Sequence, residues 1–481
     1  MLRIAQPYVQ IVLVSFLENR PKTAFTLETT IVYVPLGFTP FHMHTLEQLQ
    51  SGALTGTTHL KLSCGLTHFP MEILQLADTL EVLDLSGNSL TALPQEFARL
   101  TKLRIVFLSN NPFTELPVVL GRCGHLEMIG FKACQIETVP ENSIPASCRW
   151  LILTDNKITH LPASIGNCTQ MQKLMLAGNR LQALPQELAN CKNLELLRIS
   201  ANQLQQLPDW LFNLPKLAWL AFAGNPCSAS NLAQHKVQTT NWNHLGIEEQ
   251  LGEGASGIIY KAKVKPETNP ILPEEVAVKV FKGSVTSDGL PEDEINASLV
   301  AGAHPNLVET LAILTGHPEK KQGLVMGLIP EGFSNLGGPP SFSTITRDTF
   351  PPGTTFTLPH VLTIARGIAS VLVHLQAKGV LHGDVYAHNT LVNKHGNPLF
   401  GDFGAATVFD NTKAPLAVNL ERVEVRAFGC LLDDLLQHLA PVPAEDSQTV
   451  KALKSLRDQC LQTDLIQRPS FLEIETSLTD I

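Results

Sequence analysis

The chain of 481 residues is long enough for about two or three domains, each with its own hydrophobic core. Its formal net charge of -9 argues against a nucleic-acid partner, because phosphate backbones require a basic surface. The apolar run near the N-terminus is too short to cross a bilayer. The nine cysteines, without C-x-x-C pairs, argue against a zinc ribbon or disulfide framework, so a reducing, cytoplasmic environment is predicted.

Residues 1–42 show no repeat and no periodicity. Met43 follows them directly, and we expect the native chain to start there, with a short extension as the alternative. Thr45 and Gln48 form a capping-box pattern, which predicts a short helix ending near Gly52. We expect this helix, within residues 43–57, to cover the open end of the repeats that follow.

Residues 58–228 repeat the pattern L-x-L-x-x-N-x-L-x-x-L-P. The units close, at intervals of 22 to 24 residues, at Pro70, Pro94, Pro117, Pro140, Pro162, Pro185 and Pro208. This period is typical of leucine-rich repeats, so the segment is predicted to be an α/β solenoid in which each unit adds one parallel strand.

A column of amides runs through the repeats. It comprises Asn88, Asn111, Asn156, Asn179, Asn202 and Asn225, and Cys134 replaces asparagine once. Because an amide both donates and accepts, the column is predicted to satisfy buried backbone groups of neighbouring units. Cys123, Cys168 and Cys191 recur with the repeat and are predicted to be buried apolar residues rather than ligands.

The outward positions of the predicted strands are unusually apolar. They include Val82, Ile105, Phe107, Met128, Trp150, Ile152, Met175, Leu196 and Trp219. These side chains could shield one another, but an apolar column with two tryptophans is typical of interaction sites. We therefore expect a protein substrate or regulator to bind the concave face.

Residues 229–243 form a polar linker without a membrane span, so the repeats and the segment after them are expected in one compartment. The next segment opens with Gly252, Gly254 and Gly257 in the spacing G-x-G-x-x-G. Strand-forming residues follow these glycines, which favours a β-hairpin over phosphates rather than a dinucleotide-binding turn before a helix.

A lone lysine, Lys279, ends the apolar run Val276–Val278 of the next predicted strand. It could reach solvent at a sheet edge or bind the α- and β-phosphates of a nucleotide, and the motifs downstream favour the second interpretation. In the helix that follows, Glu294 is the expected ion-pair partner of this lysine, with Glu292 as the alternative.

Three polar residues, Asp384, Asn389 and Asp402, then follow at the intervals of a catalytic loop and a metal-binding D-F-G segment. Phosphoryl transfer needs few protein groups beyond oxygen and amide side chains that hold magnesium and orient a hydroxyl. The spacing therefore predicts a site that uses ATP and Mg²⁺.

In this order, the motifs of residues 244–481 resemble those of the eukaryotic-like protein kinase family, an α+β bilobal fold. The whole chain resembles bacterial leucine-rich-repeat-containing protein kinases. The resemblance implies that Asp384 orients the substrate hydroxyl and accepts its proton, and that Asn389 and Asp402 ligate magnesium.

The same resemblance assigns the nucleotide site. It implies that Gly252, Gly254 and Gly257 cover the phosphates, that Lys279 holds them, and that Met326 is the gatekeeper before the adenine-binding hinge.

Two residues of the catalytic loop depart from the family pattern. Gly383 replaces the arginine of H-R-D, so control by activation-loop phosphorylation is not expected. Tyr386 stands where serine/threonine kinases usually carry a lysine that helps to neutralise the γ-phosphate. Transfer should therefore be slow unless another cation, such as His388, contributes.

The segment after the D-F-G motif also departs. It has no A-P-E motif and is short up to Glu424, which aligns with the usual aspartate of the next helix. Arg468, whose ordinary partner would be the glutamate of the missing motif, could instead pair with Glu421.

These patterns predict an ATP- and magnesium-dependent protein kinase that acts on protein hydroxyls, with serine and threonine expected ahead of tyrosine. The alternative is a nucleotide-binding pseudokinase or scaffold, and a small-molecule kinase is a third possibility. The sequence leaves open whether the repeats fold back on the kinase.

Overall fold

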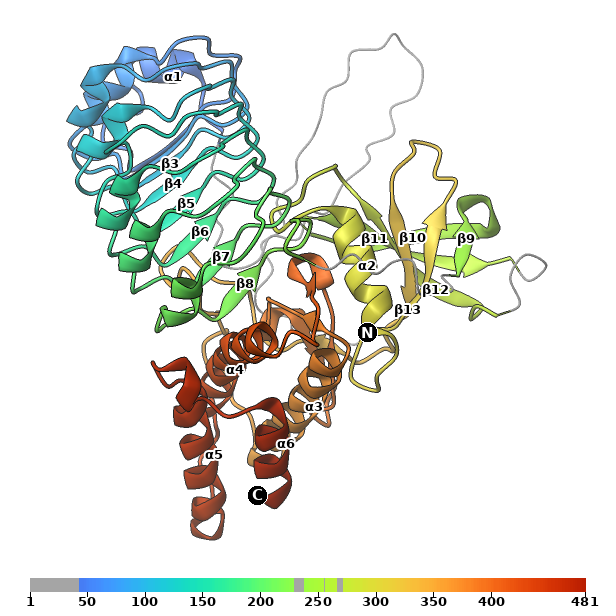
Figure 1. Cartoon of the computed structure of the whole chain (residues 1–481). Coiled ribbons are helices and arrows are strands. Elements are labelled where there is room, and N and C mark those ends of the chain that lie inside the picture. The colour runs from blue at the N-terminus through green and yellow to red at the C-terminus, as the bar shows by residue number, and fades with distance from the viewer. Residues whose placement is uncertain (1–42, 229–237, 255, 266–270) are drawn as a thin grey trace, which may run out of the picture.

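The computed structural model describes residues 43–228, 238–254, 256–265 and 271–481. A curved solenoid is followed by a domain of two lobes (Figure 1), which confirms the predicted fold class. The predicted N-terminal extension, residues 1–42, lies outside the described residues.

The solenoid begins with a short helix, α1 (Leu46–Gln50), whose capping box joins Thr45 and Gln48. Eight parallel strands follow in chain order: β1 (His59–Lys61), β2 (Val82–Asp84), β3 (Ile105–Phe107), β4 (Met128–Gly130), β5 (Trp150–Ile152), β6 (Lys173–Met175), β7 (Leu196–Arg198) and β8 (Trp219–Ala221). Leucine, isoleucine and valine at the central strand positions are buried between the sheet and the outer face of the solenoid.

Short 3-10 helices line the outer face of the solenoid. They span Met71–Leu76, Gln95–Arg99, Val118–Arg122, Ala163–Asn167, Gln186–Asn190 and Asp209–Asn213. The repeat proline stands at the N-cap of each of them, because its fixed φ suits the entry to a helix and its missing N–H is not needed there.

The asparagine column forms the predicted hydrogen bonds. Asn88 donates through Nδ2 to the carbonyls of Leu62, 2.8 Å away, and Leu85, 2.9 Å away, and its Oδ1 accepts from the Leu66 N–H. The same pattern recurs in the later units, and where Cys134 replaces asparagine its thiol donates to the Leu108 carbonyl of the preceding unit. The column therefore satisfies buried backbone groups between units.

Cys123, Cys168 and Cys191 of the repeats are free, buried thiols, as predicted. Burial raises the pKa of the Cys168 thiol to about 12, so this side chain remains a neutral, apolar packing group.

The small lobe contains a six-stranded sheet in the order β10-β11-β12-β14-β13-β9. Its elements are β9 (Thr239–Asn241), a 3-10 turn (Trp242–His244), β10 (Leu245–Glu253), β11 (Gly257–Val264), β12 (Glu275–Phe281), helix α2 (Pro291–Ala301), β13 (Thr310–Thr315) and β14 (Gly323–Gly327). Strand β9 pairs in parallel with β13. The predicted linker, 229–243, was thus too long, because its last residues already belong to this sheet.

The large lobe is mainly helical. It contains α3 (Leu358–Ala377), α4 (Ala414–Gln437), α5 (Ser447–Cys460), α6 (Phe471–Asp480) and the 3-10 turns Ala387–Asn389, Phe403–Ala405, Ala444–Asp446 and Leu465–Gln467. Two small sheets join β15 (Ser334–Asn335), β17 (Thr390–Val392) and β18 (Pro398–Phe400), and β16 (Val380–Leu381) with β19 (Thr407–Val408).

Helix α3 is the one described helix with the length and hydropathy of a membrane span. Half of that stretch is buried, and α3 packs against α4 and α6 in the core of the large lobe. These are the properties of a core helix.

The solenoid and the large lobe share their hydrophobic cores. Met175, Leu196 and Trp219 of the concave face pack in the core of the large lobe, and β8 lies against α4 (Figure 1). In return, Leu420 and Phe409 of the large lobe belong to the core of the solenoid. Much of the apolar column on the concave face is therefore covered by the same chain.

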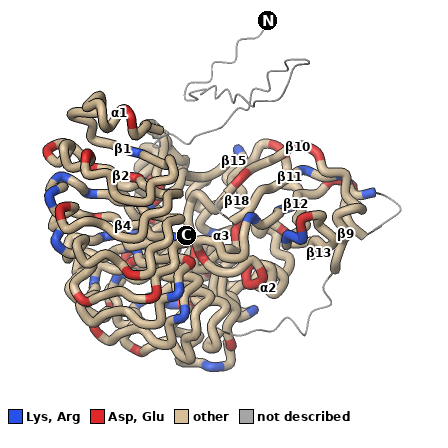
Figure 2. The backbone as a smooth tube through the Cα atoms, turned by 90° about the horizontal axis from the view of Figure 1, so that it is seen from above, with Lys and Arg blue, Asp and Glu red and all other residues tan. Residues whose placement is uncertain are grey.

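Charged residues are distributed over both parts of the molecule. Figure 2 shows acidic and basic positions interspersed along the described backbone of the solenoid and of the lobes.

Candidate active site

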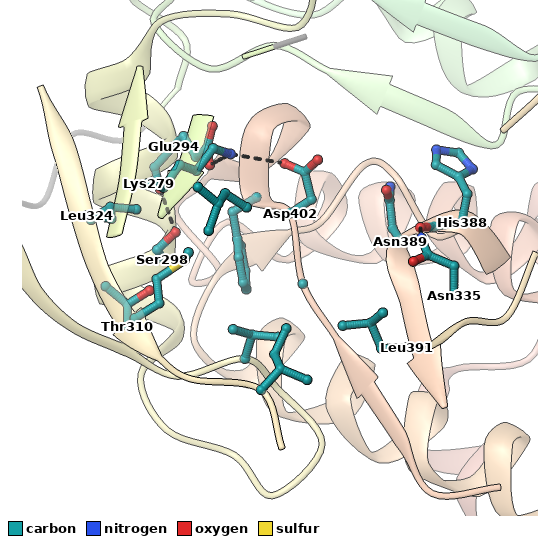
Figure 3. A pocket seen from close by; sticks show the side chains of 16 residues that line it. Lys279, Glu294, Ser298, Thr310, Leu324, Asn335, His388, Asn389, Leu391 and Asp402 are labelled. Atoms are coloured by element: carbon teal, nitrogen blue, oxygen red, sulfur yellow. Dashed lines mark hydrogen bonds and ion pairs between the residues drawn. The ribbon is translucent and has the colours of Figure 1, made fainter. Parts of the chain in front are cut away.

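A cavity of about 270 Å³ lies between the small sheet and the large lobe (Figure 3). Lys279 of β12, Met326 of β14, and Asn389 and Asp402 of the large lobe all line it. The structure thus brings these four predicted site residues to one place, although they come from distant parts of the chain.

The three predicted glycines, Gly252, Gly254 and Gly257, lie at the turn of the antiparallel hairpin β10–β11. They are not among the described residues that line the cavity. The Gly254 N–H donates to the Gly257 carbonyl, 2.9 Å away. A Cβ atom on Gly257 would lie 2.7 Å from the Val280 carbonyl, so this glycine permits the close approach of the hairpin to β12. Gly252 and Gly254 face open space.

Lys279 is buried between two carboxylates. Its Nζ contacts Glu294 Oε1 and lies 3.5 Å from Asp402 Oδ1 (Figure 3). Burial by itself would lower the pKa of the Lys279 ammonium, but the charges of Asp402 and Glu294 outweigh it and raise that pKa. The lysine is therefore charged, and the partner from α2 is Glu294 rather than Glu292.

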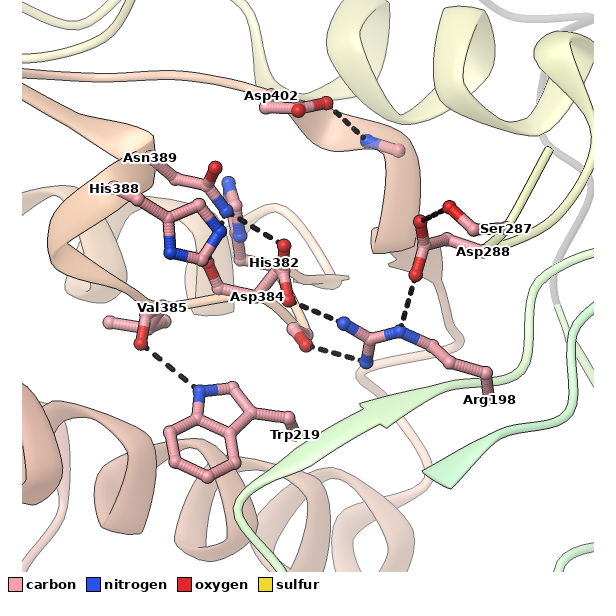
Figure 4. Close-up of polar contacts among 12 residues, drawn as sticks. Arg198, Trp219, Ser287, Asp288, His382, Asp384, Val385, His388, Asn389 and Asp402 are labelled. Atoms are coloured by element: carbon pink, nitrogen blue, oxygen red, sulfur yellow. Dashed lines mark hydrogen bonds and ion pairs between the residues drawn. The ribbon is translucent and has the colours of Figure 1, made fainter. Parts of the chain in front are cut away.

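Asp384 and Asn389 are joined within one loop. Asn389 donates through Nδ2 to the carboxylate of Asp384, 2.7 Å away, and to the Asp384 carbonyl, 3.0 Å away (Figure 4). These bonds leave the amide oxygen of Asn389 available to a ligand. Asp402, in a left-handed conformation with φ of 58°, accepts from the Gly404 N–H.

The oxygens of Asn389 and Asp402 suit magnesium. Carboxylate and amide oxygens are hard ligands, and Mg²⁺ in phosphoryl-transfer sites is held by one or two carboxylates together with substrate phosphates. Among the described residues, no cluster of three or more His, Cys, Asp or Glu side chains could hold a metal by itself. The donor set therefore fits a magnesium ion that is shared with a nucleotide.

Buried polar contacts hold the loop in place. The Gly383 N–H donates to Glu424 Oε1 of α4, 2.7 Å away. Burial raises the pKa of the Glu424 carboxyl to about 8. His382 stacks on Phe400, with ring centroids 4.1 Å apart, and its Nε2 lies 3.2 Å from the Gly401 carbonyl oxygen.

His388 lines the cavity beside Asn389. Burial opposes its charged form, but Asp348, whose Oδ1 lies 2.6 Å from His388 Nδ1, raises the pKa of the imidazole. Asp348 also accepts from the Ala387 N–H and so holds the turn. The role of Asp348 could not be anticipated, because it lies in a Pro-, Ser- and Thr-rich stretch without a motif.

A residue of the repeats also reaches this loop. Arg198, at the end of β7, donates to Asp288 Oδ1 at 2.6 Å, to the Gly383 carbonyl at 3.0 Å, and to Asp384 Oδ1 (Figure 4). It was not among the predicted site residues. The only signal in the sequence is a single arginine at a strand position where neighbouring units carry Met175 and Ala221.

The predicted pair of Arg468 and Glu421 was wrong. Arg468 is 1% exposed and donates to the carbonyls of Gln462, Arg422 and Pro215, whereas Glu421 accepts from the Phe471 N–H. The carbonyls replace the missing carboxylate because the fold brings three of them to one buried guanidinium.

Comparison with known families agrees with this geometry. Residues 245–426 match the protein tyrosine and serine/threonine kinase family, and residues 55–113 and 169–226 match the leucine-rich repeat family. The chain combines leucine-rich repeats with a protein kinase domain. The loop 382–389, Lys279 of β12 and its partner Glu294 of α2 all lie within the residues that match the kinase family.

The chain is similar to several animal proteins. It is 28% identical over 230 residues to human cyclin-dependent kinase 11B, with 43% of this chain and 27% of the relative covered. It is 28% identical over 194 residues to fibroblast growth factor receptor 1 of Dugesia japonica, with 38% and 21% covered. Serine/threonine-protein kinase PITSLRE of Drosophila melanogaster is 27% identical over 219 residues, with 41% and 21% covered.

The chain therefore spans only 21% to 27% of the length of these relatives. They are eukaryotic, and the narrower resemblance to bacterial proteins stays a prediction.

Proposed function

We propose that the chain is an ATP- and magnesium-dependent kinase that transfers the γ-phosphoryl group to protein hydroxyls. The observation that carries the proposal is a pair of ion contacts: Lys279 contacts both Glu294 and Asp402. These three residues line the same cavity as Asn389. The similarity to PITSLRE of Drosophila melanogaster, a serine/threonine-protein kinase, favours serine and threonine as acceptors.

The cavity wall suggests how ATP would lie. Met326, Ile329 and Leu391 offer apolar surface for the adenine, next to the hinge that follows β14. Lys279 would hold the phosphates below the hairpin of Gly252, and its pairing with Glu294 keeps its ammonium charged and oriented.

In transfer, the acceptor hydroxyl would attack the γ-phosphorus while the bond to the ADP oxygen breaks. Asp384 would orient that hydroxyl and take its proton. Magnesium, held by Asn389 and Asp402, would neutralise charge on the phosphates.

A pseudokinase is the second candidate, and one observation favours it. Both carboxylate oxygens of Asp384 already accept hydrogen bonds, one from Arg198 and one from Asn389. Tyr386 supplies no cation in place of the usual lysine. Such a site could bind nucleotide and transfer slowly or not at all.

Two measurements separate the candidates. Purified protein and Asp384→Asn are incubated with labelled ATP, magnesium and cell lysate, and binding of ATP to both is measured by thermal shift. A kinase labels proteins only when Asp384 is present. Equal labelling, with ATP binding retained, would establish the pseudokinase.

The solenoid is proposed to hold a protein substrate or regulator, and the chain is proposed to be cytoplasmic. The kinase domain covers Leu196 and Trp219. Ile105 and Phe107 of β3 stay partly exposed, although the Phe107 ring already packs against Phe342 of the kinase domain, with ring centroids 6.0 Å apart. The N-terminal units are therefore the part of the concave face proposed for a separate protein.

A further inference from the structure

We propose that Arg198 of the repeats is a positioning residue of the kinase active site, which holds the Asp384 carboxylate in a catalytic loop where Tyr386 supplies no cation. This inference rests on the proposed kinase function and assigns to the solenoid a part in the chemistry. It goes beyond the recruitment of a partner.

The first support is the geometry of the guanidinium. Arg198 is 2% exposed, and its three nitrogens bind Asp288, the Gly383 carbonyl and Asp384. Asp288 is itself held by the Ser287 hydroxyl, 2.6 Å away (Figure 4). A planar guanidinium with a partner on each side is fixed in orientation. The ammonium of a flexible lysine would be fixed less well.

The second support is the state of Tyr386. Its ring stacks on Trp219, with centroids 4.5 Å apart and planes 6° apart, and the Trp219 indole N–H donates to the Val385 carbonyl, 3.1 Å away. Burial keeps the phenol neutral by raising its pKa. Tyr386 is therefore a packing residue, and His388 is bound to Asp348. Among the described residues, Arg198 is the cation that forms an ion pair with Asp384.

The third support is that the repeats pack tightly against the catalytic loop and the kinase domain around Arg198. A Cβ atom on Gly383 would lie 2.5 Å from the Leu220 carbonyl oxygen of the repeats, so the family arginine cannot stand there. The Phe222 N–H donates to Thr407 Oγ1 at 3.1 Å, and Arg468 donates to the Pro215 carbonyl at 3.1 Å.

These contacts argue against a detachable inhibitory arm. Release of the repeats would expose Leu196 and Trp219 to water and leave Arg468 without one of its carbonyl partners. A permanent contact with the reacting carboxylate fits a positioning role.

The test compares the full chain with Arg198→Met and Arg198→Lys. Turnover and KM for ATP are measured with labelled ATP, magnesium and a degenerate peptide mixture that offers Ser, Thr and Tyr. We expect Arg198→Met to lower kcat by about 100-fold, the scale of a displaced catalytic group, with KM for ATP changed by less than about threefold. The kcat of Arg198→Lys should lie between that of the unmodified chain and that of Arg198→Met. Added guanidinium should restore part of the activity of Arg198→Met.

The matched control is Arg149→Met. Arg149 also lies on the repeats, but its ion pair and side-chain hydrogen bond stay within them, to Glu127, 3.6 Å away, and to Gln172, 2.8 Å away. We expect this variant to keep the turnover of the unmodified chain.

Three results would overturn the inference. Turnover of Arg198→Met close to that of the unmodified chain would show that the contact is not used. Higher turnover would show inhibition, and a loss restored by neither lysine nor guanidinium would show a purely structural role. An unmodified chain no more active than Asp384→Asn would instead refute the proposed function itself. Should Arg198→Met not fold, Asp288→Asn, which weakens the contact on the outer side of the guanidinium, is measured instead, and unchanged or higher turnover of this variant would overturn the inference.

Discussion

At the scale of single residues, the buried charges of the nucleotide site depend on one another. Lys279 and Glu294 are 7% and 4% exposed, and each offsets the cost of burying the other. The sequence predicted a pair between Lys279 and a glutamate of the next helix, because a lone lysine in an apolar strand and an acidic helix start are local patterns, but it left Glu292 open as the alternative to Glu294. It could not show that Asp402 lies on the other side of the lysine.

Removal of one charge of this pair should be more harmful than removal of both. Lys279→Met leaves Glu294 buried without its cation, so we expect about 3 kcal/mol of lost stability in urea unfolding. The double variant Lys279→Met, Glu294→Leu should recover part of that loss. A double variant as unstable as the sum of its single changes would show that the two residues do not interact.

A second residue-scale prediction concerns Gly383. Its φ of 72° and its closeness to Leu220 make any side chain unfavourable. Gly353 also has a positive φ, 84°, but a Cβ atom there would meet nothing within 4 Å. Gly353→Ala should therefore cost only about 1 to 2 kcal/mol for the left-handed backbone.

Gly383→Ala should cost about 1 to 3 kcal/mol more than Gly353→Ala, because it adds overlap with the repeats. Urea unfolding of both variants measures the difference. Equal losses would mean that the repeats do not press on the catalytic loop.

At the scale of elements, α4 links the catalytic loop to the core through Glu424. The pKa of this carboxyl is raised from 4.5 to about 8 by burial, so between these values the native state keeps a proton that the unfolded state has released. Stability should therefore fall as the pH rises through this window.

Urea midpoints at about pH 5 and pH 8 test this effect in the unmodified chain and in Glu424→Gln. The unmodified chain should lose stability between the two, and Glu424→Gln should lose less. Asp434, whose pKa burial raises to about 7, should retain part of the dependence in the variant. A pH response identical in both proteins would contradict the assignment to Glu424.

Elements also show where local patterns succeed. The repeat prolines and the asparagine column predicted the solenoid because each unit makes the same contacts with its neighbours. The linker was misjudged for a related reason. The residues of β9 become a strand only by pairing with β13, far along the chain.

At the scale of the whole molecule, the two domains should unfold together. Leu196 and Trp219 complete the core of the large lobe, while Phe409 and Leu420 complete the core of the solenoid. We expect a single cooperative transition for the full chain in calorimetry, and poor solubility of a fragment restricted to residues 238–481. Two separate transitions, or a stable and soluble fragment, would show that the cores are independent.

The sequence by itself determined what arises from local spacing: the solenoid, the order of the kinase motifs, and which residues form the proposed nucleotide site. Only the tertiary structure decided that the repeats close over the catalytic loop and place Arg198 on Asp384. The physical reason is distance along the chain. Within their own motif, Gly383 and Tyr386 are recognised only as replacements of an arginine and a lysine. Their partners in the structure, Leu220 and Trp219, lie more than 160 residues earlier, and no local sequence pattern connects them.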